Sequence, residues 1–210
     1  RTAGVRAVNQ RPAREVGCDT DTMTELTVFT IGHSSHPNER FIALLKQHEV
    51  ESVVDIRRFP ASRKFPHFNR EQLQASLNAA GIDYYWFEAL GGRRSRGKDD
   101  PPSPNLGLRN ESFRNYADYM LTADFQQAVE NLLQIAAAGR TTIMCAEAMF
   151  WQCHRRLVSD YLVALSGVTV QHLFPNGDVK PHTLTRDAKV SGSTVTYPES
   201  RPLFDGDGIQ

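Results

Sequence analysis

Residues 26–56 read LTVFTIGHSSHPNERFIALLKQHEVESVVDI, a segment with the pattern of a strand, a helix and a second strand. Residues 26–31 form a β-branched and apolar run that ends at Gly32, as is typical of a buried strand. Pro37 is favourable at a helix start, and Phe41, Leu44 and Leu45 follow it at helical spacing. Residues 52–56 are again mostly apolar. Two strands joined through a helix are expected to lie parallel in one sheet.

The same alternation continues along the chain. Further strands are predicted at residues 83–87, 141–145 and 168–173, and further helices around residues 69–80, 113–136 and 153–166. Five strands that alternate with helices predict a Rossmann-like three-layer α/β sandwich with a mostly parallel sheet of about five strands. Five strands are too few for an eight-stranded α/β barrel.

The ends of the chain have a different composition from its centre. Residues 1–24 are basic at first and lack the apolar stretch of a secretory signal, so we interpret them as a disordered segment or an extension. Residues 189–210 are rich in Ser, Thr, Pro, Asp and Gly and offer few core positions. The sequence therefore predicts a single α/β domain over residues 25–188 and a loose tail after it.

Composition excludes several classes of protein. The 24 basic and 24 acidic residues cancel, which gives no sign of a nucleic-acid-coating protein or an acidic tail. No apolar run reaches the roughly 18 residues of a membrane span, so no membrane partner is expected. Three cysteines, Cys18, Cys145 and Cys153, cannot all pair within one chain, and such a sparse, odd number favours a cytoplasmic location. Neutral charge leaves the oligomeric state open.

Polar and ionisable side chains follow three of the predicted strands at the point where each strand ends. Because ligands of open α/β sheets bind beyond the carboxyl ends of the strands, we expect a functional site there. The residues concerned are His33 and Ser34 after the first strand, Arg57 and Arg58 after the second, and Cys145, Glu147, Cys153, His154 and Arg155 after the fourth.

Two features of these loops indicate an anionic ligand. Ser34 precedes a helix N-terminus, where free N–H groups bind anions, although Ser34 or Ser35 could equally act as a helix cap. Arginines suit phosphate and carboxylate groups, but they could also form a solvated basic face. We expect Ser34, Arg57 and Arg155 to bind the anion, and His33, Arg58, Gly91, Gly92, Arg93 and Cys153 to contact the substrate. Neither common nucleotide-binding fingerprint is present, so no cofactor is identified.

Cys145, Glu147 and His154 are the expected catalytic residues. A thiolate near a helix start and cationic neighbours has a lowered pKa, Glu147 could act as base or acid, and His154 could transfer protons. Cys145, Glu147, Cys153 and His154 also carry metal-ligating atoms, but their spacing differs from the usual zinc pair and no metal is expected. A third interpretation is that both cysteines are packed in the core.

Several short motifs occur together in an order that resembles the domain-of-unknown-function 488 family. They are Thr30-Ile31-Gly32-His33-Ser34, Val54-Asp55-Ile56-Arg57 with Pro60, Leu90-Gly91-Gly92, Tyr116 with Tyr119-Met120, Met144-Cys145-Ala146-Glu147, Cys153-His154-Arg155 and His182-Thr183-Leu184-Thr185. The resemblance implies a bacterial or archaeal cytosolic α/β domain, and some members of that family are labelled DNA-repair proteins. It also implies a site made of Ser34, Arg57, Cys145, Glu147, Cys153, His154 and Arg155.

Together these patterns favour a small cytosolic enzyme that acts on a phosphate- or carboxylate-bearing substrate. A nucleotide or a component of nucleic acid is the expected substrate, because aromatic residues accompany the basic loops. One alternative is a binding module for nucleotides or nucleic acid that performs no catalysis. Another is a sulfur carrier similar to rhodanese, suggested by a cysteine in a strand-to-helix loop.

Overall fold

A computed structural model describes residues 26–199, so the expected extension at residues 1–24 and the last residues of the expected tail lie outside the described part. Its main sheet has six strands in the order β3-β2-β4-β1-β5-β6. The strands are β1 (Thr27–Gly32), β2 (Ser52–Asp55), β3 (Asp83–Trp86), β4 (Thr141–Cys145), β5 (Thr169–Leu173) and β6 (Val179–Pro181). Strands β1 to β5 pair in parallel, and β6 is antiparallel to β5. The predicted Rossmann-like, mostly parallel α/β fold is therefore confirmed.

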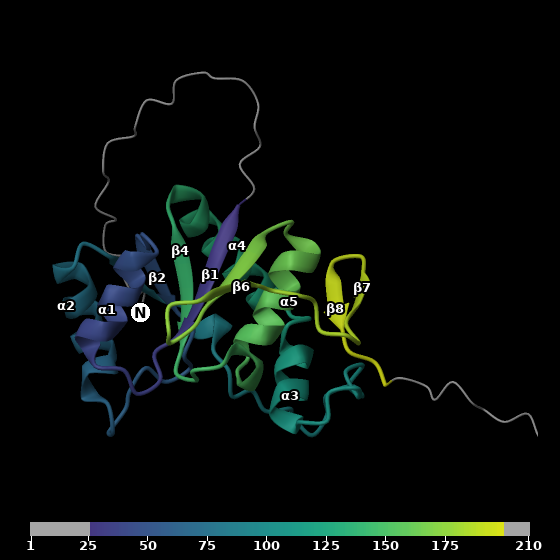
Figure 1. The fold of residues 1–210 in the computed structure, drawn as a ribbon. Helices are drawn as coiled ribbons and strands as arrows, with labels where there is room; N and C mark the ends of the chain where they lie inside the picture. Colours follow the sequence, from purple (N-terminus) through teal and green to yellow (C-terminus); the bar gives the residue numbers. More distant parts are fainter. Residues whose placement is uncertain (1–25, 200–210) are drawn as a thin grey trace, which may run out of the picture.

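Five helices cover the two faces of the sheet (Figure 1). They are α1 (Asn38–Gln47), α2 (Arg70–Ala79), α3 (Glu111–Tyr119), α4 (Ala123–Ala138) and α5 (Arg155–Leu165). Apolar side chains of α1 and α2 pack on one face of the sheet, and those of α3, α4 and α5 pack on the other. Within residues 26–199 no helix has the length and apolar character that crossing a membrane would require.

Alternating side chains along each strand supply the two cores. In β1, Val28 contacts the core beneath α3, α4 and α5, whereas Phe29 and Ile31 contact the core beneath α1 and α2. In β4, Met144 faces α1 and α2, so the next residue, Cys145, faces the other three helices. This alternation determines on which side of the sheet the thiol lies.

The strand order places a topological switch point between β1 and β4. The chain leaves β1 toward β2 on one side, and it leaves β4 toward β5 on the other side. In open α/β sheets the crevice at the carboxyl ends of two such strands is where ligands bind. The end of β4 carries Cys145, so the topology and the chemistry indicate the same place.

Residues 189–197 differ from the loose tail that the composition suggested. They form a hairpin of β7 (Lys189–Ser191) and β8 (Thr194–Thr196), followed by a buried Tyr197. The Tyr197 hydroxyl donates to Asp160 at 2.8 Å, and its backbone N–H donates to Asn105 at 2.8 Å. The expectation is wrong here because a few specific contacts hold this segment against α5. The short strand β6 was also not predicted, since none of its residues is buried.

Candidate active site at the carboxyl ends of the strands

The loop between β4 and α5 carries most of the predicted catalytic residues and lies close to the end of β1. The backbone N–H groups of His33 and Ser34 donate to the carbonyl oxygens of Cys145 and Ala146, both at 2.9 Å. Gly32 makes this approach possible, because a Cβ atom at that position would overlap the carbonyl oxygen of Glu147. The two neighbouring strand ends are thus joined directly beside the thiol.

Two thiols and one imidazole form a compact buried cluster at this edge. The His154 Nδ1 atom lies 3.8 Å from Cys145 Sγ and 3.5 Å from Cys153 Sγ. All three atoms lie within 4.8 Å of one another. Cys145 at the end of β4 and the residues Cys153 and His154 just before α5 therefore lie together in the structure.

The orientation of His154 leaves its Nδ1 lone pair directed at the sulfur atoms. Its Nε2 atom lies 3.0 Å from the carbonyl oxygen of Ile56, which can only accept a hydrogen bond. Nε2 therefore carries a ring proton, and Nδ1 is the ring atom that faces the thiols. A proton that leaves a thiol of the cluster has a place on Nδ1.

Arg155 brings a buried positive charge to the cluster. Its side chain is 1 % exposed, its guanidinium donates to the carbonyl oxygens of Glu147 and Ala148, and its Nε has no partner. Among residues 26–199, no carboxylate forms an ion pair with it. Because a buried charge is costly without a counter-ion, this environment favours a negative charge nearby, such as a thiolate.

The two thiols differ in acidity. Burial opposes ionisation of Cys153, but the hydrogen bond from Cys145 and the charges of His154 and Arg155 outweigh it and hold its pKa well below the ordinary value. The hydrogen bond to Cys153, together with burial, raises the pKa of Cys145 well above the ordinary value. These directions favour Cys153 over Cys145 as the more acidic thiol. The sequence had suggested Cys145 as the reactive thiol, and that assignment stays a prediction.

A pocket of about 580 Å³ opens beside this cluster. The residues that line it include Arg57, Arg58, Phe59, Gly92, Arg93, Asn110, Ser112, Phe113, Tyr116, Cys145, Glu147, Cys153 and His154. Arg58 pairs with Glu88 at 3.1 Å, whereas no hydrogen bond or ion pair of the Arg93 side chain is found among the described residues. The pocket thus combines two thiol groups, an imidazole and cationic groups, with aromatic rings in its wall.

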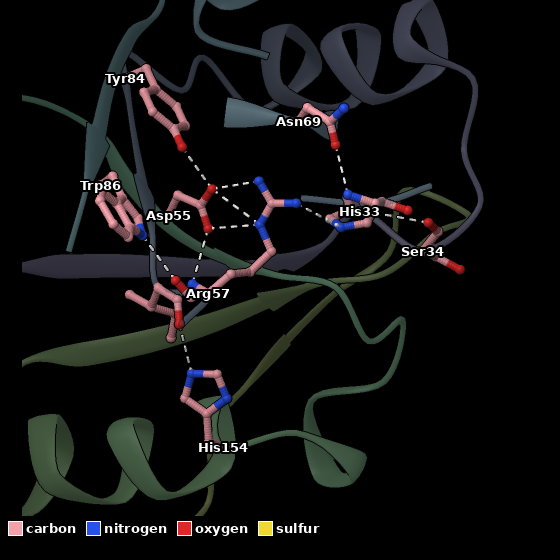
Figure 2. Close-up of polar contacts among 10 residues, drawn as sticks. His33, Ser34, Asp55, Arg57, Asn69, Tyr84, Trp86 and His154 are labelled. Atoms are coloured by element: carbon pink, nitrogen blue, oxygen red, sulfur yellow. Dashed lines mark hydrogen bonds and ion pairs between the residues drawn. The ribbon is translucent and has the colours of Figure 1, made fainter. Parts of the chain in front are cut away.

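Arg57 and Asp55 form a buried ion pair that shapes one wall of the pocket (Figure 2). Asp55 accepts bonds from Arg57 Nη2 at 2.6 Å, from Arg57 Nε at 2.9 Å and from the Tyr84 hydroxyl at 2.7 Å. Burial opposes the charge of Arg57, but Asp55 more than compensates and raises its pKa. Trp86 donates to the Arg57 carbonyl at 2.9 Å. These contacts fix the backbone that presents the Ile56 carbonyl to His154.

Ser34 and His33 are not among the residues that line the pocket, and His33 Nε2 lies 3.3 Å from Arg57 Nη1 (Figure 2). The backbone N–H groups of residues 33 and 34 bond to the β4 loop, so these two groups are not available to an anion, and anion binding at Ser34 stays a prediction. Ser34 does not cap α1 either, since α1 begins after Pro37 without a side-chain cap. Burial, followed by the charge of Arg57, lowers the pKa of His33 to about 4, so its ring is neutral.

Close packing explains why residues 91 and 92 are both glycines. A Cβ atom on Gly91 would lie 2.7 Å from Arg58 Cα, and one on Gly92 would lie 2.9 Å from His154 Nδ1. Contacts this short do not occur between real side chains without movement of the neighbours. Gly91 therefore lets the loop approach the backbone of residue 58, and Gly92 leaves room for the imidazole.

The remaining predicted residues occupy different places. Arg155 lies behind the pocket wall, and Glu147 is exposed at the rim, outside the Cys-Cys-His cluster. The sequence did not predict Asp55 and Tyr84, which hold Arg57, as part of the site. It also did not predict that Phe113 and Tyr116 line the pocket. An acidic residue inside the apolar run 52–56 was a signal for the first of these.

The fold and the pocket define an α/β protein with a cysteine-containing site at the carboxyl edge of its sheet. Residues 37–162 match the family described as Domain of unknown function DUF488. The match covers more than half of the 210 residues, so the chain belongs to this family, and the resemblance expected from the motifs is confirmed. No curated protein and no solved structure matches the chain.

Proposed function

We propose that the protein is an enzyme that binds an anionic substrate in the pocket and attacks it with the thiolate of Cys153. The observation that carries the proposal is the position of Cys153 Sγ, 3.5 Å from His154 Nδ1, 3.5 Å from the backbone N–H of Arg155 and within 4.8 Å of Cys145 Sγ. A thiolate stabilised in this way is the reactive form of cysteine. Reduced thiols of this kind fit a cytosolic location.

The substrate is recognised by charge and by shape. Arg58 and Arg93 line the pocket, and they suit a phosphate or carboxylate group. Phe59 is 63 % exposed at the same pocket, and a large exposed aromatic side chain is suited to stacking on a planar group. A nucleotide or a component of nucleic acid combines both features, and we propose this class of substrate.

The residues divide the reaction between them. Cys153 Sγ forms a bond to an electrophilic atom of the substrate, and the leaving group departs with a proton from His154 Nδ1. Water, deprotonated by His154, then releases the product and restores the thiolate. Arg155 compensates the negative charge on sulfur throughout, and Cys145 donates a hydrogen bond to it. Glu147, exposed at the rim, is available to orient the attacking water.

Alkylation by a matched pair of reagents tests this proposal. Iodoacetamide is neutral and iodoacetate is anionic, so the ratio of their rates at each cysteine measures the attraction of the pocket for an anion. We expect Cys153 to react with an apparent pKa below the roughly 8.5 of a free thiol. We also expect iodoacetate to be favoured about tenfold relative to a free thiol, which corresponds to about 1.4 kcal/mol of attraction.

Two variants and a control complete the experiment. Arg93→Ala should remove most of the preference for iodoacetate, while Lys98→Ala, which alters a basic residue of the same loop outside the pocket, should leave it unchanged. Cys145→Ser should keep Cys153 reactive. If Cys153 stays inert at every pH while anions still bind, the protein is a binding module and the proposal is wrong. Persulfide on Cys153 after treatment with thiosulfate would indicate a sulfur carrier instead.

A further inference from the structure

The Cys145–Cys153–His154 cluster has the geometry of a metal site. Among residues 26–199 it is the one group of His, Cys, Asp or Glu side chains whose ligand atoms come this close together. All three residues are buried, and all three line the pocket. The spacing along the sequence gave no sign of this, because the two cysteines come from the end of β4 and the start of α5 and meet only in the folded chain.

The distances in the cluster agree with tetrahedral zinc coordination. Zinc binds thiolate sulfur at about 2.3 Å and imidazole nitrogen at about 2.0 Å, so a tetrahedral angle separates sulfur from nitrogen by about 3.6 Å. The two sulfur–nitrogen distances to His154 Nδ1 are 3.5 and 3.8 Å. Both sulfur–nitrogen distances are therefore close to those of a tetrahedral zinc site, and the two sulfur atoms lie within 4.8 Å of each other.

The surroundings of His154 are those of a metal-bound histidine. Metal-ligating histidines generally donate their second ring N–H to a carbonyl or carboxylate group, which orients the ring. His154 Nε2 lies 3.0 Å from the Ile56 carbonyl, and the Asp55–Arg57 ion pair holds that carbonyl in place. The backbone N–H of Arg155 lies 3.5 Å from Cys153 Sγ and would support a thiolate ligand.

We infer that Cys145, Cys153 and His154 bind one zinc ion, with the fourth coordination position facing the pocket. Three protein ligands and one open position are typical of exchangeable or catalytic zinc rather than structural zinc. Two thiolates balance the charge of the ion, so the buried charge of Arg155 then favours an anion in the open position.

The zinc site goes beyond the proposed function and limits it. The same sulfur atoms cannot be both metal ligands and free nucleophiles, so bound zinc switches the thiol chemistry off. The metal-free, reduced protein is then the form that attacks a substrate, and a thiophilic metal ion regulates access to that form. The assay of metal binding needs no substrate, and it can fail or succeed independently of the alkylation assay.

Cobalt is the probe for the site, because it takes the same ligands as zinc and absorbs light. The full chain, reduced with a phosphine and freed of metal, is titrated with Co²⁺ and then with Zn²⁺. We expect one equivalent of Co²⁺ to produce the near-ultraviolet charge-transfer band of cobalt–thiolate bonds, and one equivalent of Zn²⁺ to abolish it. Zinc should also protect Cys145 and Cys153 together against alkylation.

Variants locate the site and allow the inference to be refuted. Cys145→Ser, Cys153→Ser and His154→Gln should each weaken zinc binding by at least about 100-fold, since each removes one of three ligands. Cys18→Ser is the matched control and should leave binding unchanged. Absence of the charge-transfer band, or a band that survives the Cys145→Ser and Cys153→Ser changes, would overturn the zinc site. Rapid alkylation of Cys153 in that case would leave the proposed function standing.

Discussion

Replacement of Asp55 by asparagine tests the role of the buried ion pair behind the pocket. The Asp55 carboxylate is fully buried and accepts hydrogen bonds from the Arg57 guanidinium, the Arg57 backbone and the Tyr84 hydroxyl. The variant Asp55→Asn keeps the shape of the side chain but removes its charge. It also places an NH₂ group where one of these donors now points.

The size of the effect follows from the burial of both partners. Breaking one side of a buried ion pair costs about 3–5 kcal/mol, because the remaining charge is left without a partner. Asparagine keeps one acceptor, so we expect the free energy of unfolding to fall by about 3 kcal/mol. For a domain of this size the melting temperature should then fall by about 6–12 °C.

Urea denaturation of the single and double variants provides the assay. Asp55→Asn combined with Arg57→Met removes the unpaired charge and should recover about 1–2 kcal/mol of the loss. The single variant should also slow alkylation of Cys153, because the Ile56 carbonyl would no longer be held against His154. A loss below about 1 kcal/mol in the single variant, or a double variant no more stable than the single one, would refute the reasoning.

Three further predictions concern acidity, packing and the carboxyl-terminal segment. Burial is the main cause that lowers the pKa of His33 to about 4 and that of His172 to about 3, so both rings are neutral in the folded chain. The unfolded chain takes up these protons below about pH 6.5, so stability should fall by roughly 2 kcal/mol per ring between about pH 7.5 and about pH 5. Gly92→Ala should displace the His154 ring and slow Cys153 alkylation about tenfold, with a loss of about 1 kcal/mol in stability. Tyr197→Phe should cost about 2 kcal/mol, because it removes a buried donor to a carboxylate.

Each of these predictions has a control. The variant His172→Asn should remove about half of the pH dependence, and an unchanged slope would contradict the assignment. Gly97→Ala, in an exposed loop, should leave alkylation unchanged, and an equal effect of both glycine changes would exclude the packing argument. If the free energy of unfolding of the Tyr197→Phe variant in urea were unchanged, the bond from the Tyr197 hydroxyl to Asp160 would contribute nothing to stability.

The sequence was sufficient for the parallel sheet because its strands are continuous apolar runs and its helices have apolar residues on one face. It was insufficient for β6 and the β7–β8 hairpin, since these depend on contacts between distant residues. Tyr197 is buried because Asp160 and Asn105 accept its two donors, and no local pattern reveals such a pairing.

The position of the site was predictable for a similar reason, and its internal arrangement was not. Strand ends bearing Cys145 and Arg57 could be expected to meet at one edge of a parallel sheet. Burial and hydrogen-bond direction determine that Asp55 holds Arg57. The same two quantities make Cys153, rather than Cys145, the more acidic thiol. Those quantities exist only once the chain has folded.

The central place of β1 in the sheet has a consequence for how the protein is made. This strand is synthesised before the other described strands, yet its neighbours are β4 and β5, and Val28 pairs with Thr141, about 110 residues later. At translation rates of about 5–20 residues per second, β1 waits roughly ten seconds on the ribosome with both edges unpaired. The nascent chain is therefore open to association with other chains during that interval. We expect its yield in cells to depend on chaperones that bind exposed strands more than on the stability of the finished fold.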